Sequence, residues 1–221
     1  NYPLLGHMRF ILEKVRPEIQ QYFIERNWDG RPYSRDMRSI IYERSKNEHM
    51  EQPFGTELDV YAPGYEFFEQ TIATTPAKEG QHRVRVGGKD CKQPYDMALL
   101  NVSAMSFGAL SCNAIRALNL GAKLGNFAHD TGEGGLTKYH LENGGDLIWE
   151  IGTAYFGCRT LDGKFDPEVF KEKAAKPQVK CVSIKISQGA KPGLGGVMPA
   201  AKVTPEIAEI RGVPVGKKCV S

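Results

Sequence analysis

The sequence predicts a parallel α/β fold, either a β/α barrel or a doubly wound sheet. From Leu99 onward, strand-like segments alternate with amphipathic helix-like segments, the order expected of parallel strands joined by crossover helices. Three strand-like segments run into small, polar, glycine-rich loops, as strands do at the ligand-binding edge of such folds. With 221 residues, the chain is long enough to bury a full core.

Residues 1–98 are predicted to form a helical and irregular N-terminal extension. Apolar residues recur at three- and four-residue steps up to Phe23, which predicts an amphipathic, packed helix interrupted at Arg16–Pro17. Ser34 is predicted to cap a second helix, and the alternating segment HRVRV at 82–86 predicts a strand. The apolar positions expected on the packed faces are Met8, Ile11, Leu12, Val15, Ile19, Tyr22 and Phe23 in the first helix, and Met37, Ile40 and Ile41 in the second.

Residues 99–221 form the second predicted domain, where strands and helices alternate. Ser111 is predicted to cap one helix, and Asp166 with Pro167 to begin another. The apolar face of the first of these helices is expected to contain Ile115, Leu118, Ala122 and Leu124. In chain order, the expected elements are a strand and loop in LLNVSAMSFG (99–108), a helix in CNAIRALNLGAKLG (112–125), a short strand in NFAHD (126–130), a helix in DPEVFKEKAA (166–175) and an alternating strand in VKCVSIKISQG (179–189).

Composition excludes several functional classes. The 29 basic and 26 acidic residues are scattered and give a net charge of only +3, which argues against a nucleic-acid partner. The five cysteines are widely spaced without a C-x-x-C pair, so we expect reduced thiols in a cytoplasmic protein rather than disulfides or a zinc ribbon. No apolar run approaches the roughly 18 residues of a membrane span. The sequence begins at Asn1 without an initiator methionine and ends at Ser221 without a closing helix, so we expect it to be a fragment of a longer protein.

Three glycine-rich loops are expected to share one pocket. They are SAMSFG (103–108), HDTGEGG (129–135) and KISQGAKPGLGG (185–196), each after a predicted strand. Neither a P-loop nor a G-x-G-x-x-G dinucleotide fingerprint occurs, so backbone amides are expected to face another flat or anionic ligand. The serines of the first loop lack a G-x-S-x-G elbow, and we interpret them as hydrogen-bonding residues.

Glu133 and Lys185 are the charged residues expected in this pocket. Glu133 is the one acid among the glycines of GEGG. Lys185 alternates with Ser183, Cys181 and Ser187, a small polar face that suits a barrel interior, although a lysine at the rim that reaches water would give the same pattern. His129 and Asp130 lie beside Glu133 but lack metal-ligand spacing, so no metal site is predicted.

Long motifs resemble the FMN-binding domain of glutamate synthases, and more closely the stand-alone glutamate synthase-like proteins that lack the amidotransferase domain. They are PFGTELDVYAPGYEFFEQ, LLNVSAMSFGALS, TGEGGLTKYHLENGGDLIWEIGTAYFGCR and VSIKISQGAKPGLGGVMPAAKVTPEIAEIRG. The resemblance implies a TIM-type (β/α)8 barrel that holds FMN, with residues 99–221 as its first part. It also implies reduction of 2-iminoglutarate, formed from 2-oxoglutarate and ammonia, to glutamate, with ferredoxin or NAD(P)H as electron donor.

The resemblance also implies roles for individual residues. Glu133 and Lys185 would be catalytic. Lys185 and Gln188 would border the flavin, Gln188 and Lys191 would bind the keto acid, and the remaining flavin-binding residues would be Ala104, Met105 and Ser106. A fixed cation near the N1/O2 edge of reduced FMN would favour hydride chemistry.

The chain departs from the family pattern in two places. Glutamate synthases have Asn-Thr before Gly-Glu-Gly-Gly, whereas this chain has Asp130 and Thr131, which adds a charge beside the expected site. The cysteines are not grouped for an iron–sulfur cluster, so any cluster would require residues outside this chain. The resemblance leaves room for a membrane anchor in the intact protein.

Length limits what the chain is expected to do alone. A β/α barrel needs about 250 residues, so residues 99–221 supply about half of one, and we expect an exposed sheet edge and weak or absent FMN binding. Two alternatives stay open. One is a non-redox barrel lyase or aldolase in which Lys185 forms a Schiff base, and the other is a non-catalytic binding module.

Overall fold

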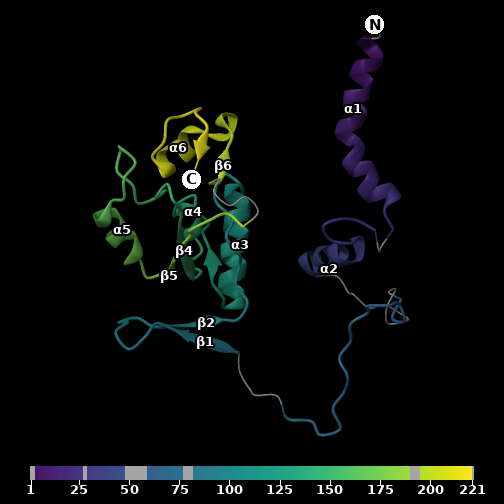
Figure 1. Ribbon diagram of the computed structural model, residues 1–221, viewed down its shortest axis with the longest axis horizontal. Helices are drawn as coiled ribbons and strands as arrows, with labels where there is room; N and C mark the ends of the chain where they lie inside the picture. Colours follow the sequence, from purple (N-terminus) through teal and green to yellow (C-terminus); the bar gives the residue numbers. More distant parts are fainter. Residues whose placement is uncertain (1–2, 27–28, 48–58, 77–81, 190–194, 221) are drawn as a thin grey trace. The chain divides into compact units, whose positions relative to one another are not determined.

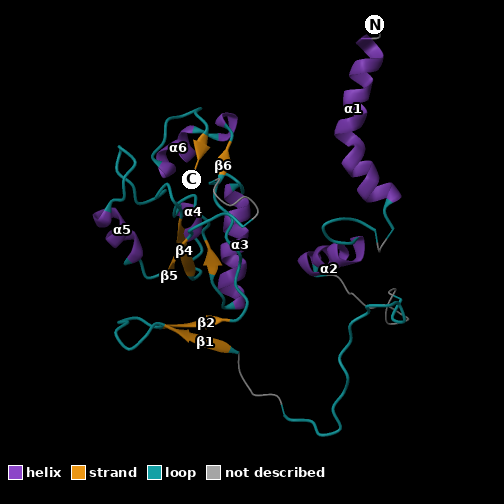
Figure 2. Cartoon of the chain, in the orientation of Figure 1, coloured by secondary structure: helices purple, strands orange, loops and turns teal. Residues whose placement is uncertain are grey.

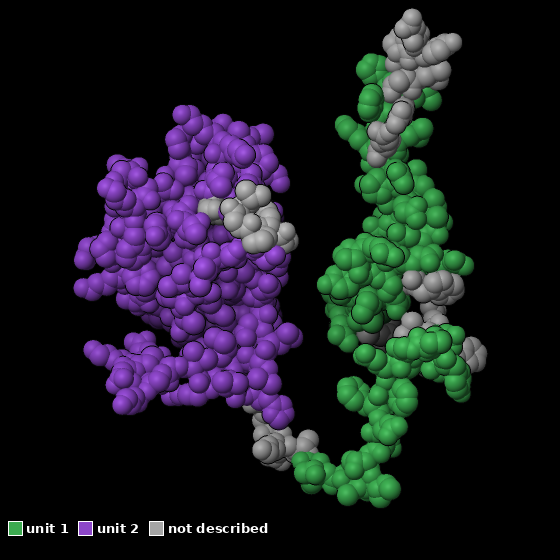
Figure 3. All heavy atoms as spheres, in the orientation of Figure 1, with its two compact units in different colours: residues 1–76 green, residues 77–221 purple. Residues whose placement is uncertain are grey.

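The computed structural model describes residues 3–26, 29–47, 59–76, 82–189 and 195–220 (Figure 1). The chain divides into two compact units, Asn1–Pro76 and Ala77–Ser221 (Figure 3). The sequence predicted a domain boundary after residue 98, and that domain division stays a prediction. The contacts assign the hairpin that precedes residue 98 to the second unit.

The N-terminal unit consists of helices with exposed apolar side chains. Helix α1 spans Pro3–Ile19, continues as a π-helical turn at Gln20–Ile24, and is followed by α2 at Arg35–Lys46. The expected interruption at Arg16–Pro17 is wrong, because a proline removes one helical hydrogen bond without ending a helix that keeps its others. The positions expected to pack are exposed in both helices: Met8, Ile11, Leu12, Val15, Ile19, Tyr22, Phe23, Met37, Ile40 and Ile41.

An antiparallel hairpin opens the second unit. Strand β1 spans Arg83–Val86, which confirms the predicted strand, and pairs with β2 at Tyr95–Ala98. The hydroxyl of Tyr95 donates to the carboxylate of Asp146 at 2.9 Å, in the connection between the next two strands. The hairpin is therefore attached to the sheet by a side-chain hydrogen bond.

The centre of the second unit is a parallel sheet with its strands in chain order (Figure 2). Strands β3 at His129–Asp130, β4 at Leu147–Ile151 and β5 at Val179–Ile184 pair in parallel, and Val102 adds a parallel bridge to β3. The first expected strand is reduced to that bridge, and β4 was not predicted. Sequential parallel strands fit part of a β/α barrel, whereas closure of the barrel stays a prediction.

The outer edge of this sheet is exposed, as the sequence led us to expect. Among the described residues, β5 has β4 as its only strand partner. The side chains of Ile184 and Ile186, at and just beyond the end of β5, are 76% and 87% exposed.

The two helices predicted by capping signals are confirmed. Helix α3 spans Cys112–Gly125, and the hydroxyl of Ser111 accepts from the amide of Ala114 at 3.2 Å. Helix α5 spans Pro167–Ala174, where Asp166 accepts from two first-turn amides. The predicted apolar face of α3 is only partly right: Ile115 and Ala122 are buried, but Leu124 is exposed and the polar Asn119 is buried instead.

Two apolar clusters support the sheet. Leu147, Trp149 and Ile151 alternate along β4 and pack against α5, where the ring of Trp149 stacks on Phe170 at 5.6 Å. The second cluster joins α3 to β6 at Val197–Met198, α6 at Pro205–Arg211 and β7 at Cys219–Val220. A 3₁₀ turn at Ala200–Lys202 lies between β6 and α6.

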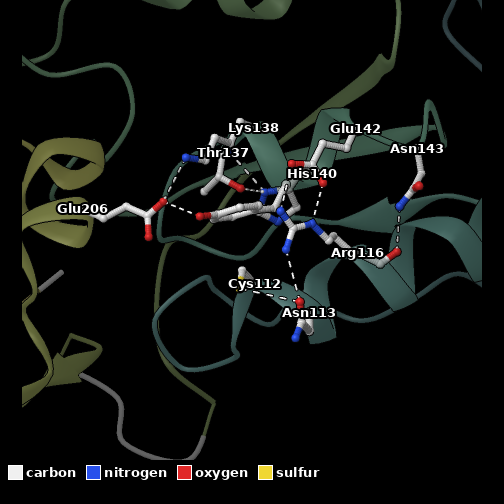
Figure 4. A network of polar contacts seen from close by, with 10 residues as sticks. Cys112, Asn113, Arg116, Thr137, Lys138, His140, Glu142, Asn143 and Glu206 are labelled. Atoms are coloured by element: carbon white, nitrogen blue, oxygen red, sulfur yellow. Dashed lines mark hydrogen bonds and ion pairs between the residues drawn. The ribbon is translucent and has the colours of Figure 1, made fainter.

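A polar network connects α3, α6 and the short helix α4 at Lys138–Leu141 (Figure 4). Arg116 of α3 forms an ion pair with Glu142 and lies over the ring of Tyr139. Tyr139 donates a hydrogen bond to Glu206 of α6, and Lys138 pairs with the same carboxylate at 3.3 Å. The network fixes α4, and therefore the loop that runs from β3 to α4.

Two buried histidines lie next to each other, one in β3 and one in α4. His129 and His140 are both fully buried, with their ring centroids 5.4 Å apart. Neither ring nitrogen of His129 has a hydrogen-bond partner, whereas Nδ1 of His140 lies 2.8 Å from the hydroxyl of Thr137. Burial lowers the pKa of His129 to about 4 and that of His140 to about 3, so both are neutral at pH 7.

Gly132 follows β3 in a left-handed conformation, with φ of +65°, and a Cβ atom there would lie 2.5 Å from the amide nitrogen of Ser106. We expect Gly132→Ala to lower the free energy of unfolding by about 1–3 kcal/mol, because it adds strain and a backbone clash. Urea unfolding measures the change. Gly121→Ala, in α3 with open space around its Cβ, is the control and should be neutral or stabilise by about 0.5–1 kcal/mol. Equal effects at the two positions would contradict this account.

The buried histidines make stability depend on pH. Their unfolded-state pKa is 6.5, so the unfolded chain binds protons first, and the free energy of unfolding should fall as the pH drops from 6.5 towards 4. His129→Phe should reduce this slope, because an apolar ring cannot bind a proton in the unfolded state. Urea unfolding at several pH values tests this, with the exposed His82→Gln as control. A slope unchanged by His129→Phe would refute the assignment.

Candidate functional site

The candidate site lies at the carboxyl-terminal ends of the parallel strands. We call it the mouth, and define it as the ends of β3, β4 and β5, the loops 103–108, 131–135 and 185–189, and Arg211 at the end of α6. The amide group of Gln188 donates to both carboxylate oxygens of Glu133, at 2.8 and 3.0 Å. The loop that contains Glu133 also lies against Ser106. The structure therefore brings together the three loops that the sequence expected to share a pocket.

The glycines of TGEGG make room for neighbouring chain segments. A Cβ on Gly132 would meet the backbone of Met105 and Ser106, and one on Gly134 would lie 2.8 Å from Cβ of Ser106. Gly152, after β4, provides the same room for the side chain of Glu133. The absence of a side chain at these positions therefore allows the loops to pack closely against one another.

Lys185 lies between two carboxylates. Its Nζ atom is 3.8 Å from Oε2 of Glu133 and 3.7 Å from Oε1 of Glu150. The lysine side chain is 25% exposed, and its backbone amide still donates to Ile151 of β4, one residue beyond the end of β5. The ammonium therefore lies within ion-pair distance of two acids, and the alternative of a rim lysine that reaches out to water stays open.

Two further acids belong to the mouth. Glu150 of β4 is only 7% exposed, and Asp130 of β3 accepts from the amide of Gly132 at 2.9 Å. Burial raises the pKa of Glu150, and the nearby Asp130 raises it further, while Lys185 acts in the opposite direction. Burial also raises the pKa of Asp130, against the hydrogen bond from Gly132. These carboxyl groups therefore hold protons to higher pH than exposed ones do.

Cavities lie on both sides of Glu133. One of about 150 Å³ is bounded by Glu133, Lys185 and Gln188. Another of about 270 Å³ is bounded by Glu133, Ser106 and two cations, Lys202 and Arg211. A third, mostly apolar cavity of about 370 Å³ adjoins Lys185. Glu133 is thus positioned to contact a ligand in either of the first two.

Arg211 is a candidate site residue that the sequence analysis missed. It ends helix α6, is 5% exposed, and donates to the carbonyl of Phe107 at 3.0 Å, while its Nε has no hydrogen-bond partner. Its guanidinium also lies over the ring of Phe156. No local pattern marks Arg211 as a site residue, because a basic residue in the last turn of an amphipathic helix is ordinarily explained by the helix dipole.

The other predicted site residues are placed as follows. Ala104 and Ser106 are half-buried in the first loop, and Met105 is 39% exposed between them. Lys191 lies outside the described residues. The structure brings Met105, Glu133, Lys185 and Gln188 to one mouth, whereas their chemical roles stay predictions.

The described residues include neither a grouped set of metal ligands nor a membrane-spanning helix. Within them, no group of three or more histidine, cysteine or acidic side chains is arranged to hold a metal ion. No helix in that part of the chain is long and apolar enough to span a bilayer.

Comparisons with known proteins agree with the motifs. A family model described as the conserved region in glutamate synthase matches residues 68–221. The glutamate synthase large subunit-like protein YerD of Bacillus subtilis is 34% identical over 98% of this chain and 49% of its own length. The archaeal-type glutamate synthase [NADPH] of Thermotoga sp. (strain RQ2) is 38% identical over 54% of this chain and 21% of its own.

The chain thus spans about half the length of YerD and less of the archaeal-type enzyme. The family match covers the whole described mouth, from the loop at 103–108 to Arg211. This chain belongs to the glutamate synthase family, as its motifs predicted.

Proposed function

We propose that this chain contributes the reductive site of an FMN-dependent oxidoreductase of glutamate synthase type, which reduces 2-iminoglutarate to glutamate. The observation that carries the proposal is the convergence of Ser106, Glu133, Lys185 and Gln188 at the carboxyl ends of parallel strands. Ligands bind at this edge in β/α folds, and family membership supplies the chemistry.

The residues present fit a flavin. A half-exposed methionine and two small residues, Ala104 and Ser106, offer a surface on which a flat ring can lie. Lys185 and Gln188 border the adjoining cavity with a cation and an amide. When bound there, FMN would supply the hydride, and Ala104, Met105, Ser106, Lys185 and Gln188 would hold it.

The charged side chains have separate tasks in this proposal. Lys185, held between Glu133 and Glu150, places a fixed positive charge where negative charge develops on a reduced ring, which stabilises it at little reorganisation cost. Gln188 fixes the rotamer of Glu133 through two hydrogen bonds. Glu133 then presents a carboxylate that can hold the ammonium or imine nitrogen of the substrate.

The keto-acid end of the substrate would bind to cations. Arg211 and Lys202 line the 270 Å³ cavity beside Glu133, and the unpartnered Nε of Arg211 leaves a buried donor without an acceptor. A dicarboxylate such as 2-oxoglutarate supplies such acceptors. Lys191 of the same motif is proposed to assist, ammonia is proposed as the nitrogen source, and NAD(P)H or ferredoxin as the electron donor.

Replacing Lys185 should impair reduction more than binding. In the full-length protein, Lys185→Met should lower kcat for 2-oxoglutarate with ammonia by about 10²–10³-fold with a much smaller change in KM, because the stabilising charge is lost. Steady-state assays with purified, FMN-loaded protein measure this. Lys180→Met, on β5 but paired with Asp146, is the matched control and should stay near wild type. A protein without yellow colour and without FMN uptake would contradict the proposal and favour the binding-module alternative.

The aldolase alternative predicts that Lys185 forms a Schiff base with the keto acid. Imine formation needs a neutral amine, whereas Lys185 lies within ion-pair distance of two carboxylates, an arrangement that suits an ammonium. We therefore expect borohydride treatment with 2-oxoglutarate to leave Lys185 unmodified in peptide mass spectra. Reductive trapping of the keto acid on Lys185, absent in Lys185→Met, would instead establish Schiff-base chemistry.

A further inference from the structure

Glu150 is a buried acid for which the proposed reaction has no direct use. It lies on β4 opposite the face that carries Leu147, Trp149 and Ile151, so it points into the mouth rather than into the apolar cluster. It is 7% exposed, and its Oε1 has no hydrogen-bond partner. Its ion-pair partner is the Nζ of Lys185, at 3.7 Å.

Charged groups from three elements face Glu150. They are Asp130 at the end of β3, Glu133 in the loop that follows, and Lys185 beyond the end of β5. Among the described residues, three carboxyl groups thus share one ammonium. A buried site with more acids than cations is relieved by binding a proton, because an unpaired buried carboxylate is costly.

We propose that Glu150 is a positioning residue whose protonation state controls how much of the Lys185 charge is available to the mouth. Ionised, it neutralises the ammonium from the sheet side and holds it there. Protonated, it leaves the ammonium to Glu133 and to any anion bound in the mouth. The inference rests on the proposed function for its consequence in catalysis, but the coupling between Glu150 and Lys185 is a property of this chain alone.

Burial and nearby negative charge favour the protonated form of Glu150. In Glu133, both carboxylate oxygens accept hydrogen bonds from Gln188. Glu150 has only the longer contact to Lys185, deeper burial and the negative field of Asp130. Asparagine at position 130 would remove that field, so the charge of Asp130 contributes to the protonation of Glu150.

NMR of the lysine side chain tests the coupling without flavin. Reductive ¹³C-methylation of the full-length protein keeps the charge of each lysine, and Lys185→Arg identifies the Lys185 signal. We expect this signal to shift with pH in a transition above about 4.3, the ordinary value for a glutamic acid. Glu150→Gln should abolish the transition, and Asp130→Asn should move it to lower pH. Glu142→Gln, which removes an exposed acid paired with Arg116, should leave it unchanged.

Two results would overturn the proposal: a transition that persists in Glu150→Gln, or one that Asp130→Asn does not move. Asp130→Asn keeps the test decisive should Glu150→Gln fail to fold. In FMN-loaded protein, the fall in kcat/KM as the pH rises through the Glu150 transition should be lost in Glu150→Gln and retained in Glu142→Gln. Absence of FMN activity with the NMR transition intact would refute the proposed function alone, whereas a coupled loss in Glu150→Gln supports both.

Discussion

The mouth depends on one ammonium placed between acids. Lys185 contacts both Glu133 and Glu150, so a single cation joins the loop after β3, strand β4 and the end of β5. Without it, the carboxyl groups would repel one another in a partly buried space. The two ion pairs of Lys185 add little net stability to the fold, because the cost of desolvating the charges offsets much of their attraction. Its effect is to fix the relative positions of groups that have to face one ligand.

Apolar packing on one side of the sheet orients the polar side chains toward the other side. Leu147, Trp149 and Ile151 bury their side chains against α5, and the alternation of β4 then directs Glu150 to the opposite side. The close contact between Gly132 and Ser106 brings the first loop to the second. Packing behind the sheet and glycine in front of it therefore act together, and neither alone would position Glu133 beside Lys185.

In the N-terminal unit, helices form although their apolar faces are not buried. Its two helices form where periodicity and the Ser34 cap indicated, yet the apolar faces that the same periodicity marked are exposed. A helix needs only local hydrogen bonds and propensity, whereas burial needs a partner surface. The same separation occurs in α3, where Leu124 is exposed although it continues the apolar spacing, and Asn119 is buried through hydrogen bonds to Gly145.

The sequence by itself determined the family, the capped helices α3 and α5, the strands β1, β3 and β5, and the three loops, of which the first carries Ser106, the second Glu133 and the third both Lys185 and Gln188. These follow from local signals: caps, alternation and motif spacing. Only the tertiary structure decided that Glu150 and Arg211 join the mouth, and that the glycines of TGEGG accommodate Ser106. Those features depend on which strands are neighbours and on side chains far apart in the chain, about which local patterns carry no information.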